Sequence, residues 1–381
     1  MRIMITGGGT GGHTSPALAV YDELSRRDSR LRVQWVGCSG KIEERQCRQR
    51  GIPFRSVPMA GWPRRGRLKK IGVAAILCAG LVRAFLLLRA FRPQAVFGVG
   101  GYVSLPLMLA AQRLGIPTVI HEQNRRLGMA NQMLAPRAAR IYLSFPDTLG
   151  EFPRDRAEVV GNPVRPEFVA PPERAAALAH FGLDPDRPVA LVFGGSQGAR
   201  TINQAVEERL DAWREAGIQL LWAAGKNDYD DIRKRVGSDS SAVRLFPYLE
   251  EMALACVAAD VVVARAGAST TAELAALGRP CVLVPYPHAT DNHQAQNAAA
   301  FEEAGAGLVL EDILCTGDAL LREVRGMLAD PGALAGMAER ARGLARPAAA
   351  DAIAEGIMRL LFDERVEEAA PPEAGEEEMG E

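Results

Sequence analysis

The fold is decided by the stretch Gly7-Gly8-Gly9-Thr10-Gly11-Gly12-His13, which follows a short apolar run at residues 2–5. We predict a strand for that run, a tight glycine loop after it, and an amphipathic helix that begins at Ser15 and Pro16. Serine is a favoured helix cap, and proline is favoured at the first helical position. A strand, a glycine loop and a helix N-terminus together present backbone N–H groups that can bind an anion.

The spacing of Gly7, Gly9 and Gly12 matches the dinucleotide fingerprint, but the rest of that fingerprint is missing. A dinucleotide site needs an acidic residue about 20 positions further on, at the end of the second strand, to hold a ribose. The predicted second strand, 32–36, instead runs into a Gly-Cys-Ser turn. Because the loop ends in the titratable residue His13, we interpret it as part of a reaction site rather than as a nicotinamide site.

Outward from this loop, the first half of the chain alternates short apolar strands with helical stretches, and the second half repeats the arrangement. The repeat begins with a strand, the glycine loop 194–198 and a long helix from Ala199. Short Val/Ile-rich runs separated by helices are typical of a parallel sheet covered on both faces. The predicted strands are 2–5, 32–36, 54–57, 95–98, 118–121, 140–143 and 158–160, then 189–193, 219–223, 243–246, 261–264 and 281–284.

Turn residues mark a domain boundary near the middle of the chain. Residues 161–166, Gly-Asn-Pro-Val-Arg-Pro, end the last strand of the first half. We expect two domains, 1–163 and 164–347, and the length of 381 residues favours that number. A helix at 348–362 is expected to pack back on the first domain. The acidic residues 363–381 are expected to be disordered.

The composition is that of an ordinary globular chain, with 48% hydrophobic and 24% charged residues. The six cysteines are scattered without a CxxC pair, which favours a reduced, cytoplasmic compartment. The first residues read as a strand and a loop, so we expect no signal peptide. His288, Asp291 and His293 lie close in sequence, but no further ligand type completes a metal site, and none is expected.

Charge is distributed unevenly although the formal net charge is only −1. No Asp or Glu occurs between Glu44 and Glu122, and the basic residues of that stretch suit a nucleic acid, an anionic membrane or a phosphorylated substrate. Within it, 62–92 combines Trp62, a basic cluster and an apolar run. We reject a membrane span, because Arg83 interrupts the run and it lies between two strands of one sheet. We expect a helix that packs on the sheet and also docks on an anionic bilayer.

Polar residues follow two of the buried strands, where open α/β sheets bind ligands. The strand at 118–121 runs into His121-Glu122-Gln123-Asn124. We expect His121 to be a hydrogen-bonded structural residue and Asn124 to contact sugar hydroxyls, since an amide both donates and accepts. The strand at 261–264 runs into a turn at 265–273, where Ser and Thr side chains are expected to cap a helix. The backbone N–H groups and the dipole of that helix favour a diphosphate. Glu273 either accepts from ribose hydroxyls or closes a capping box with Thr270.

Several motifs occur together in one order, and as a set they are specific: residues 8–13 (GGTGGH), 121–124 (HEQN), 161–165 (GNPVR), 194–199 (GGSQGA) and 293–294 (HQ). The chain resembles the MurG family, the peptidoglycan N-acetylglucosaminyltransferases, over about residues 1–362. The resemblance implies a GT-B fold, in which two Rossmann-like domains face each other across a cleft. It also implies inverting, metal-independent transfer of N-acetylglucosamine from UDP-GlcNAc to the muramyl C4 hydroxyl of lipid I, which makes lipid II for peptidoglycan. The expected location is the cytoplasmic face of the bacterial plasma membrane, as a peripheral protein without a cofactor or a nucleic-acid partner.

The resemblance also assigns roles to residues of this chain. The first domain would contact the donor through the glycine loop and bind sugar hydroxyls through Asn124, and Arg165 would reach the donor from the domain junction. In the second domain, Glu273 would hold the ribose and Gln294 the sugar. The substrate-binding residues implied in this way are Thr10, Gly11, Gly12, Asn124, Arg165, Ser196, Leu249, Ala268, Ser269, Thr270, Glu273 and Gln294.

Sugar transfer needs a base for the acceptor hydroxyl and stabilisation of the leaving UDP. The turn at 265–273 suits the leaving group, because developing diphosphate charge would meet a helix N-terminus. His13 is our candidate base, since an unperturbed histidine pKa of about 6.5 lets it accept a proton near neutrality. Its alternative role is to hydrogen-bond the donor or order the loop. Glu122 is the second candidate base.

Three other functions remain open from the sequence. One is a related GT-B transferase that acts on another lipid or small-molecule acceptor, such as a sterol, a diacylglycerol or an antibiotic. A UDP-sugar epimerase would share the fold but has no need of the basic and apolar stretch 62–92. A non-catalytic lipid-surface protein would explain that stretch and leave the polar strand ends unexplained.

Overall fold

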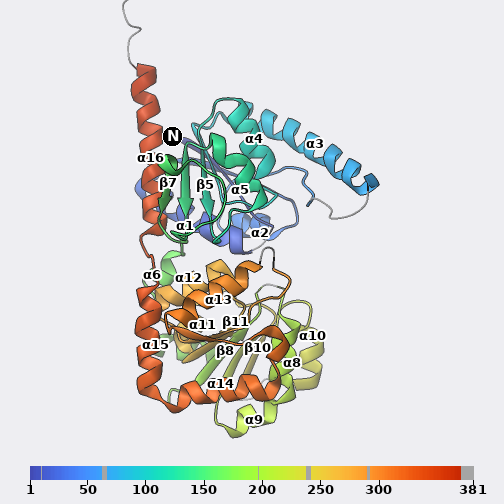
Figure 1. Cartoon of the computed structure of the whole chain (residues 1–381), viewed down its shortest axis with the longest axis vertical. Coiled ribbons are helices and arrows are strands. Elements are labelled where there is room, and N and C mark those ends of the chain that lie inside the picture. Colours follow the sequence, from blue (N-terminus) through green and yellow to red (C-terminus); the bar gives the residue numbers. More distant parts are fainter. Residues whose placement is uncertain (10, 62–66, 196, 237–241, 290–291, 370–381) are drawn as a thin grey trace, which may run out of the picture.

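Two parallel β-sheets, one in each half of the chain, form the framework of the computed structural model (Figure 1). The structure describes residues 1–9, 11–61, 67–195, 197–236, 242–289 and 292–369. The first sheet has the order β3-β2-β1-β4-β5-β6-β7. Its strands are β1 (Arg2–Thr6), β2 (Arg32–Gly37), β3 (Phe54–Ser56), β4 (Ala95–Gly98), β5 (Thr118–Glu122), β6 (Arg140–Leu143) and β7 (Ala157–Val159).

The second sheet repeats this order of winding as β10-β9-β8-β11-β12-β13. Every predicted strand is confirmed to within one residue at each end, and β13 is a strand that the sequence did not predict. The predicted α/β class with two parallel sheets is therefore correct. The strands are β8 (Val189–Phe193), β9 (Gln219–Ala223), β10 (Val243–Phe246), β11 (Val261–Ala264), β12 (Cys281–Leu283) and β13 (Gly307–Val309).

Helices cover both faces of each sheet. Those of the first half are α1 (Gly11–Arg27), α2 (Ile42–Gln49), α3 (Arg67–Phe91), α4 (Leu105–Arg113) and α5 (Met129–Leu134), with short 3₁₀ turns at Ala135–Arg137 and Arg154–Arg156. Two helices lie between the sheets in sequence, α6 (Pro166–Val169) and α7 (Arg174–Phe181). The rest are α8 (Arg200–Glu208), α9 (Leu210–Glu215), α10 (Tyr229–Val236), α11 (Met252–Ala258), α12 (Ala268–Leu277), α13 (His293–Glu303), α14 (Gly317–Ala329), α15 (Pro331–Gly343) and α16 (Ala349–Ala369), with a 3₁₀ turn at Asp312–Leu314.

The strands are buried on both faces, which is why they read as continuous apolar runs. In β8 all residues are buried. Val189, Leu191 and Phe193 join the hydrophobic cluster on one face of the sheet, and Ala190 and Val192 join the cluster on the other. This alternation follows from the two-residue period of a strand.

The last helix, α16, crosses back from the second sheet to the first (Figure 1). Its side chains Ile353, Ala354, Ile357 and Leu361 are buried in the core of the first sheet, and their spacing places them on one face of the helix. The helix runs on to Ala369, past the point at which the sequence predicted disorder to begin. Extending a helix costs far less than nucleating one, which explains the difference. Residues 370–381 lie outside the described part of the chain.

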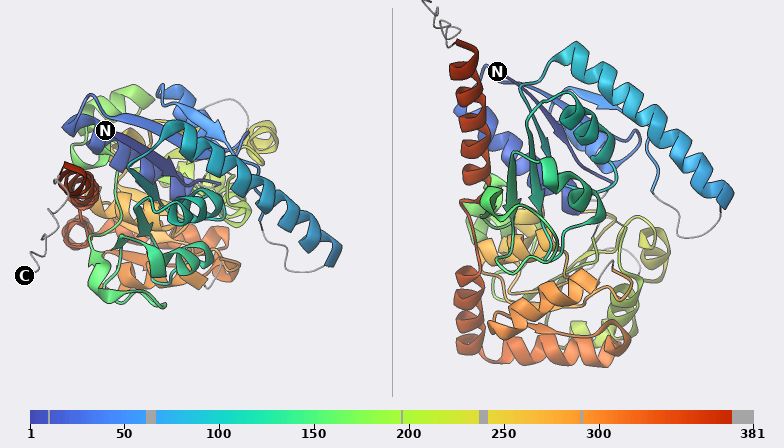
Figure 2. Two further views of the ribbon diagram at one scale, coloured as in Figure 1. Left: turned by 90° about the horizontal axis from the view of Figure 1, so that it is seen from above. Right: turned by 45° about the horizontal axis from the view of Figure 1, so that its top comes forward.

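Helix α3 joins β3 to β4 within the first sheet and packs against α4. Its buried residues Gly80, Ala84 and Leu88 recur every four positions, so a single stripe faces the domain. The N-terminal end of the helix projects away from the domain (Figure 2). Val82 is 63% exposed and Leu86 is 60% exposed. By length and composition it is the one helix of the described chain that could cross a membrane, and 17% of its apolar window is buried.

Candidate active site

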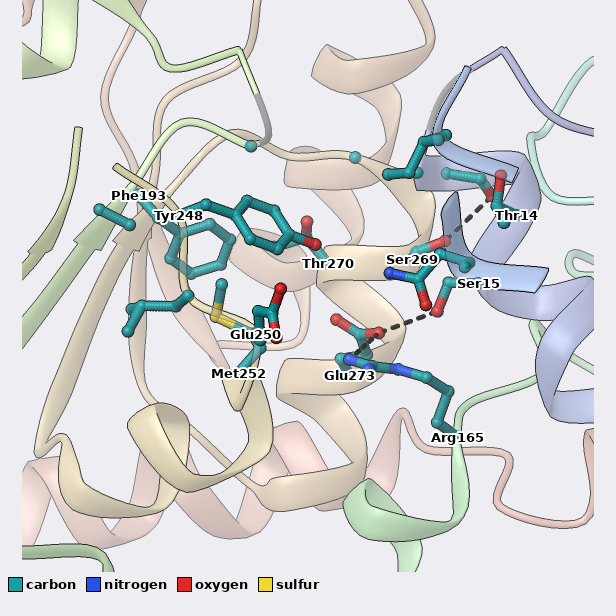
Figure 3. Close-up of a pocket in the computed structure, with 18 of the residues that line it drawn as sticks. Thr14, Ser15, Arg165, Phe193, Tyr248, Glu250, Met252, Ser269, Thr270 and Glu273 are labelled. Carbon is teal, nitrogen blue, oxygen red and sulfur yellow. Dashed lines mark hydrogen bonds and ion pairs between the residues drawn. The ribbon is translucent and has the colours of Figure 1, made fainter. Parts of the chain in front are cut away.

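The switch points of the two sheets meet at one cavity. In each sheet the order reverses beside the first strand, between β1 and β4 and between β8 and β11, and ligands of open α/β sheets bind at such points. A cavity of about 350 Å³ lies there, lined by the start of α1, the loop after β8 and the start of α12 (Figure 3). The predicted site residues that line it are Gly11, Gly12, Arg165, Leu249, Ser269, Thr270 and Glu273.

The N-terminus of α1 differs from the predicted one. The helix begins at Gly11, and Pro16 lies inside it rather than at its first position. Proline has no N–H, so the carbonyl four residues earlier, that of Gly12, loses its helical partner. The hydroxyl of Ser269 donates to that carbonyl across 3.1 Å. A hydrogen bond between the domains thus replaces one within the helix.

Glu273 also joins the two halves of the chain. The Ser15 hydroxyl donates to its carboxylate across 3.2 Å, and the Arg165 guanidinium lies 3.6 Å from the same oxygen (Figure 3). Burial raises the pKa of Glu273, and the positive charge of Arg165 opposes that shift. Arg165 also pairs with Glu167 at 3.0 Å. Neither predicted cap is present: α12 is capped by Gly267 without a side-chain bond, and Glu273 contacts Ser15 rather than Thr270.

The start of α12 offers an anion site. Its cap Gly267 has extended backbone, and the first turn carries no acidic residue. The first N–H groups of a helix have no intrahelical partner, and the helix dipole adds positive charge there. Ser269 and Thr270 lie in this turn and line the cavity. The arrangement can hold a phosphate or diphosphate.

The other end of the cavity is largely apolar, and Leu249 is the one predicted residue in its lining. Phe193 is the last residue of β8, Tyr248 precedes Leu249 in the approach to α11, and Met252 is the first residue of α11 (Figure 3). Glu250 lines the same end. An aromatic ring and a carboxylate side by side suit a flat, hydrogen-bonding base. Only the packing of α11 against the sheet brings these residues to the loop after β8, so no sequence pattern marks them.

His13 does not line this cavity. It lies between the two glycine loops of the first domain, where its Nδ1 is 2.9 Å from Oε1 of Gln123. On its other edge, a Cβ added to Gly101 would lie 3.5 Å from Nε2 of His13. Gln123 in turn bonds His121, which is fully buried and contacts the Gly161 carbonyl at 3.0 Å. Burial lowers the pKa of His121 to about 4. The predicted role of His121, a hydrogen-bonded structural residue, is confirmed by these hydrogen bonds.

Glu122, the second candidate base, is already occupied. Its buried carboxylate accepts from the backbone N–H groups of Asn124 and Gly128 and from the side-chain amides of Asn124 and Asn131. A carboxylate that accepts this many N–H bonds orders the loop around it. This geometry favours His13 over Glu122 as the candidate base. It also commits the Asn124 amide to Glu122, away from the cavity.

A buried carboxylate that the sequence analysis missed supports the glycine loop. Glu43, at the start of α2, accepts from the Gly9 N–H at 2.9 Å and from the Cys38 N–H at 3.1 Å. A Cβ on Gly8 would lie within 2.7 Å of this carboxylate and would have to displace it, and the φ of +154° at Gly8 also favours glycine. Glu43 takes an N–H group that a dinucleotide phosphate would need, which agrees with the rejected fingerprint.

The remaining predicted residues lie elsewhere. Gln294, in the first turn of α13, accepts at 2.9 Å from the N–H of Tyr286 in the loop before that helix. Ala268 lines a second cavity of about 440 Å³ on the other side of α12. Thr10 and Ser196 lie outside the described residues, as does Asp291. Among the residues that the structure describes, no three His, Cys, Asp or Glu side chains form a group that could hold a metal.

Comparison with known proteins adds independent evidence. Residues 3–143 match the glycosyltransferase family 28 N-terminal domain, and residues 189–355 match its C-terminal domain. A protein of Desulforudis audaxviator, described as UDP-N-acetylglucosamine–N-acetylmuramyl-(pentapeptide) pyrophosphoryl-undecaprenol N-acetylglucosamine transferase, is 43% identical over 370 residues, covering 94% of this chain and 98% of its own.

Solved structures agree on the fold. The chain is similar to Acinetobacter baumannii MurG, with a TM-score of 0.72 and 29% identity over 94% of this chain and 99% of that one. UDP-GlcNAc 2-epimerase from Neisseria meningitidis has the same fold, with a TM-score of 0.65 and 14% identity over 94% of this chain and 100% of that one. The two parallel-sheet domains are therefore those of the GT-B fold.

Proposed function

The chain belongs to glycosyltransferase family 28 and, within it, to the family of N-acetylmuramyl-(pentapeptide) pyrophosphoryl-undecaprenol N-acetylglucosamine transferases, and from this membership we propose its function and mechanism. The enzyme transfers N-acetylglucosamine from UDP-GlcNAc to lipid I and makes lipid II. The observation that carries the proposal is the meeting of the α1 and α12 N-termini at one cavity whose two ends suit a diphosphate and a flat base.

We assign the donor to this cavity. The N–H groups at the start of α12 receive the diphosphate, and Arg165 adds positive charge beside it. The uracil lies at the apolar end, against Phe193 and the backbone at Leu249. Glu273 accepts from the ribose hydroxyls and exchanges its contact with Ser15 for them. Gly11 and Gly12 contact the donor from the first domain.

In the proposed reaction the C4 hydroxyl oxygen of the muramyl sugar attacks C1 of N-acetylglucosamine. The bond from C1 to the diphosphate oxygen breaks, and UDP leaves with the electron pair. Attack opposite the leaving group inverts C1. His13 takes the hydroxyl proton, because its Nδ1 edge is held by Gln123 and its Nε2 edge faces the Gly101 loop. With Glu122 committed to four N–H bonds, His13 is the base we favour.

We propose that the protein binds the cytoplasmic face of the plasma membrane through α3. Exposed apolar side chains such as Val82 and Leu86 project from the domain, and the surrounding stretch has no acidic residue. Such a helix enters the headgroup region while basic residues meet anionic lipids. Trp62, which the sequence included in this surface, lies outside the described residues. The acceptor is anchored in the same membrane, and no nucleic acid takes part.

We place the division between the domains at residues 163 and 164, with the acceptor and membrane side in 1–163 and the donor side in 164–347. The contacts of Arg165 with Glu167 and Glu273 support this placement, because they connect the residues directly after the turn at 161–163 to the second unit. The helix at 348–362 returns to the first unit, where it is buried against the first sheet.

Radiolabelled transfer from UDP-GlcNAc to a lipid I analogue tests the function, with UDP-GalNAc and a plain glycolipid as alternative donor and acceptor. We expect product only with UDP-GlcNAc and the lipid I analogue. Product on the plain glycolipid alone would support the alternative, a related transferase with another lipid acceptor. Donor binding without any transfer would contradict the proposal.

A further inference from the structure

Three side chains form a hydrogen-bonded chain that ends at His13. The Gly161 carbonyl lies 3.0 Å from Nε2 of His121, Nδ1 of His121 lies 3.0 Å from Nε2 of Gln123, and Oε1 of Gln123 lies 2.9 Å from Nδ1 of His13. Gln123 is 2% exposed and His121 is fully buried. This series of hydrogen bonds therefore runs through the interior of the protein, from the turn between the domains to the proposed base.

The orientation of the Gln123 amide is fixed by groups that can only accept. Its nitrogen lies 2.9 Å from the Val99 carbonyl oxygen and 3.2 Å from the His121 carbonyl oxygen. A backbone carbonyl accepts and never donates, so the NH₂ group must lie on that side. The amide oxygen consequently faces His13. A flipped amide would set oxygen against two carbonyl oxygens and nitrogen against the ring.

The tautomer of His13 follows from that orientation. The amide oxygen only accepts, so Nδ1 of His13 carries the hydrogen, and in the neutral ring Nε2 then holds the lone pair. A neutral histidine side chain in water favours the other tautomer, with hydrogen on Nε2. His121 does not reverse the direction of these hydrogen bonds. Its Nδ1 accepts from the Gln123 amide, and its Nε2–H donates to the Gly161 carbonyl. No hydrogen bond joins Nε2 of His13 to another described residue.

We propose that Gln123 is a positioning residue for the transfer, which holds His13 in the Nδ1–H tautomer and aims Nε2 at the acceptor hydroxyl. This inference rests on the proposed function, in which Nε2 takes the proton of that hydroxyl. The Gln123 oxygen also faces the Nδ1–H of the imidazolium that results, so the same contact stabilises the ring after proton transfer. Gln123 touches no reacting atom and acts only through His13.

Nitrogen-15 NMR of the histidine-labelled full chain tests the tautomer directly. A His13→Gln variant identifies the His13 signals among the five histidines. We expect neutral His13 to show a protonated Nδ1 and an unprotonated Nε2, and Gln123→Met to move the population toward the Nε2–H form. Wild-type His13 in the Nε2–H form would overturn the inference, whether or not the enzyme is active.

Steady-state kinetics with the lipid I analogue separate positioning from folding. We expect Gln123→Met to lower kcat about 10- to 100-fold, part of what a general base contributes, with the KM for UDP-GlcNAc changed by less than about threefold. The matched control is Gln112→Met, since the Gln112 amide also makes two donor bonds, to the Thr118 hydroxyl and to the Leu134 carbonyl, and neither partner belongs to the series His121, Gln123 and His13. Equal losses in the two variants would overturn the inference. A wild type with the expected tautomer but no transfer to lipid I would instead reject the proposed function.

Discussion

The hydroxyl of Ser269 donates a hydrogen bond to the carbonyl oxygen of Gly12 across 3.1 Å, and so joins the N-termini of α12 and α1. The carbonyl is available because Pro16 has no N–H to give it. Beside this bond, the Ser15 hydroxyl reaches Glu273 of the same α12. Because Pro16 leaves the Gly12 carbonyl unpaired within α1, the two helices on either side of the cavity can form a direct hydrogen bond.

Removing this bond should weaken donor binding modestly. We expect Ser269→Ala to raise the Kd for UDP-GlcNAc about 2- to 10-fold, the effect of one hydrogen bond worth about 0.5–1.5 kcal/mol. In a Pro16→Ala background the new N–H competes for the Gly12 carbonyl, so the same change should cost less. Calorimetric titration of the four proteins measures the coupling. Additive effects would show that Pro16 does not make this contact possible.

Glu273→Gln should separate donor binding from stability. Replacing the proposed ribose acceptor is expected to raise the Kd for UDP-GlcNAc about 10- to 100-fold, as for a hydrogen bond to a charged group. The control is Glu167→Gln, which removes the other partner of Arg165 and lies outside the cavity lining. Unchanged affinity in the Glu273 variant would contradict the ribose assignment.

The stability of Glu273→Gln relative to wild type should change with pH in a defined direction. Burial raises the pKa of Glu273 above its ordinary value of 4.5, so the folded protein holds this proton more tightly than the unfolded chain does. Wild-type stability therefore falls as pH rises from 4.5 through the folded-state pKa. Glutamine does not titrate, and Arg165 retains Glu167. We expect the Tm of Glu273→Gln relative to wild type to increase over that range, and a decrease would contradict the burial argument.

Gly101→Ala should impair transfer without impairing donor binding. The added Cβ would lie 3.2 Å from Cδ2 and 3.5 Å from Nε2 of His13 and 3.3 Å from the Gly8 carbonyl oxygen, at the edge of His13 that we propose faces the acceptor. Gly115→Ala is the matched control, because its φ of +73° equals the +74° of Gly101 within a degree and nothing lies within 4 Å of its Cβ. We expect kcat to fall about 10- to 100-fold in the first variant only. Similar losses in both would point to backbone strain.

The exposed face of α3 should control membrane binding. We expect Val82→Glu with Leu86→Glu to reduce co-sedimentation with anionic phospholipid vesicles at least about 10-fold, since each buried aliphatic side chain contributes about 1.5–3 kcal/mol. Val159→Glu is the control, because Val159 is 48% exposed on another element. UDP-GlcNAc binding should be the same in all variants. Full vesicle binding by the double variant would place the membrane surface elsewhere.

The framework was predictable because its signals are local. Continuous apolar runs define the buried strands to within a residue, whereas β13 is short and begins at Gly307. The start of α1 was misread, because a proline inside the first turns resembles one at the first position, and only the contact with Ser269 shows the difference. The end of α16 was misread because composition does not show that a preceding helix will propagate.

The site was predictable where residues follow a strand and unpredictable where packing brings them together. Glu43 reaches the glycine loop from another helix, and Tyr248 reaches the cavity from the approach to α11. Glu122 is a candidate base by its position after a strand, and only the folded structure shows the four N–H groups that donate to its carboxylate. The sequence did not single out Gln123 between Glu122 and Asn124, because its proposed role depends on contacts with Val99 and His13.

The most direct test of the account compares His13→Ala with Glu122→Gln in the lipid I transfer assay, with UDP-GlcNAc binding measured by calorimetry in each. We predict that His13→Ala keeps the donor Kd within about threefold and loses about 100- to 10,000-fold in kcat, the contribution of a general base. Glu122→Gln should retain far more turnover than His13→Ala. A His13→Ala enzyme that keeps most of its turnover while Glu122→Gln loses it would contradict the assignment of the base.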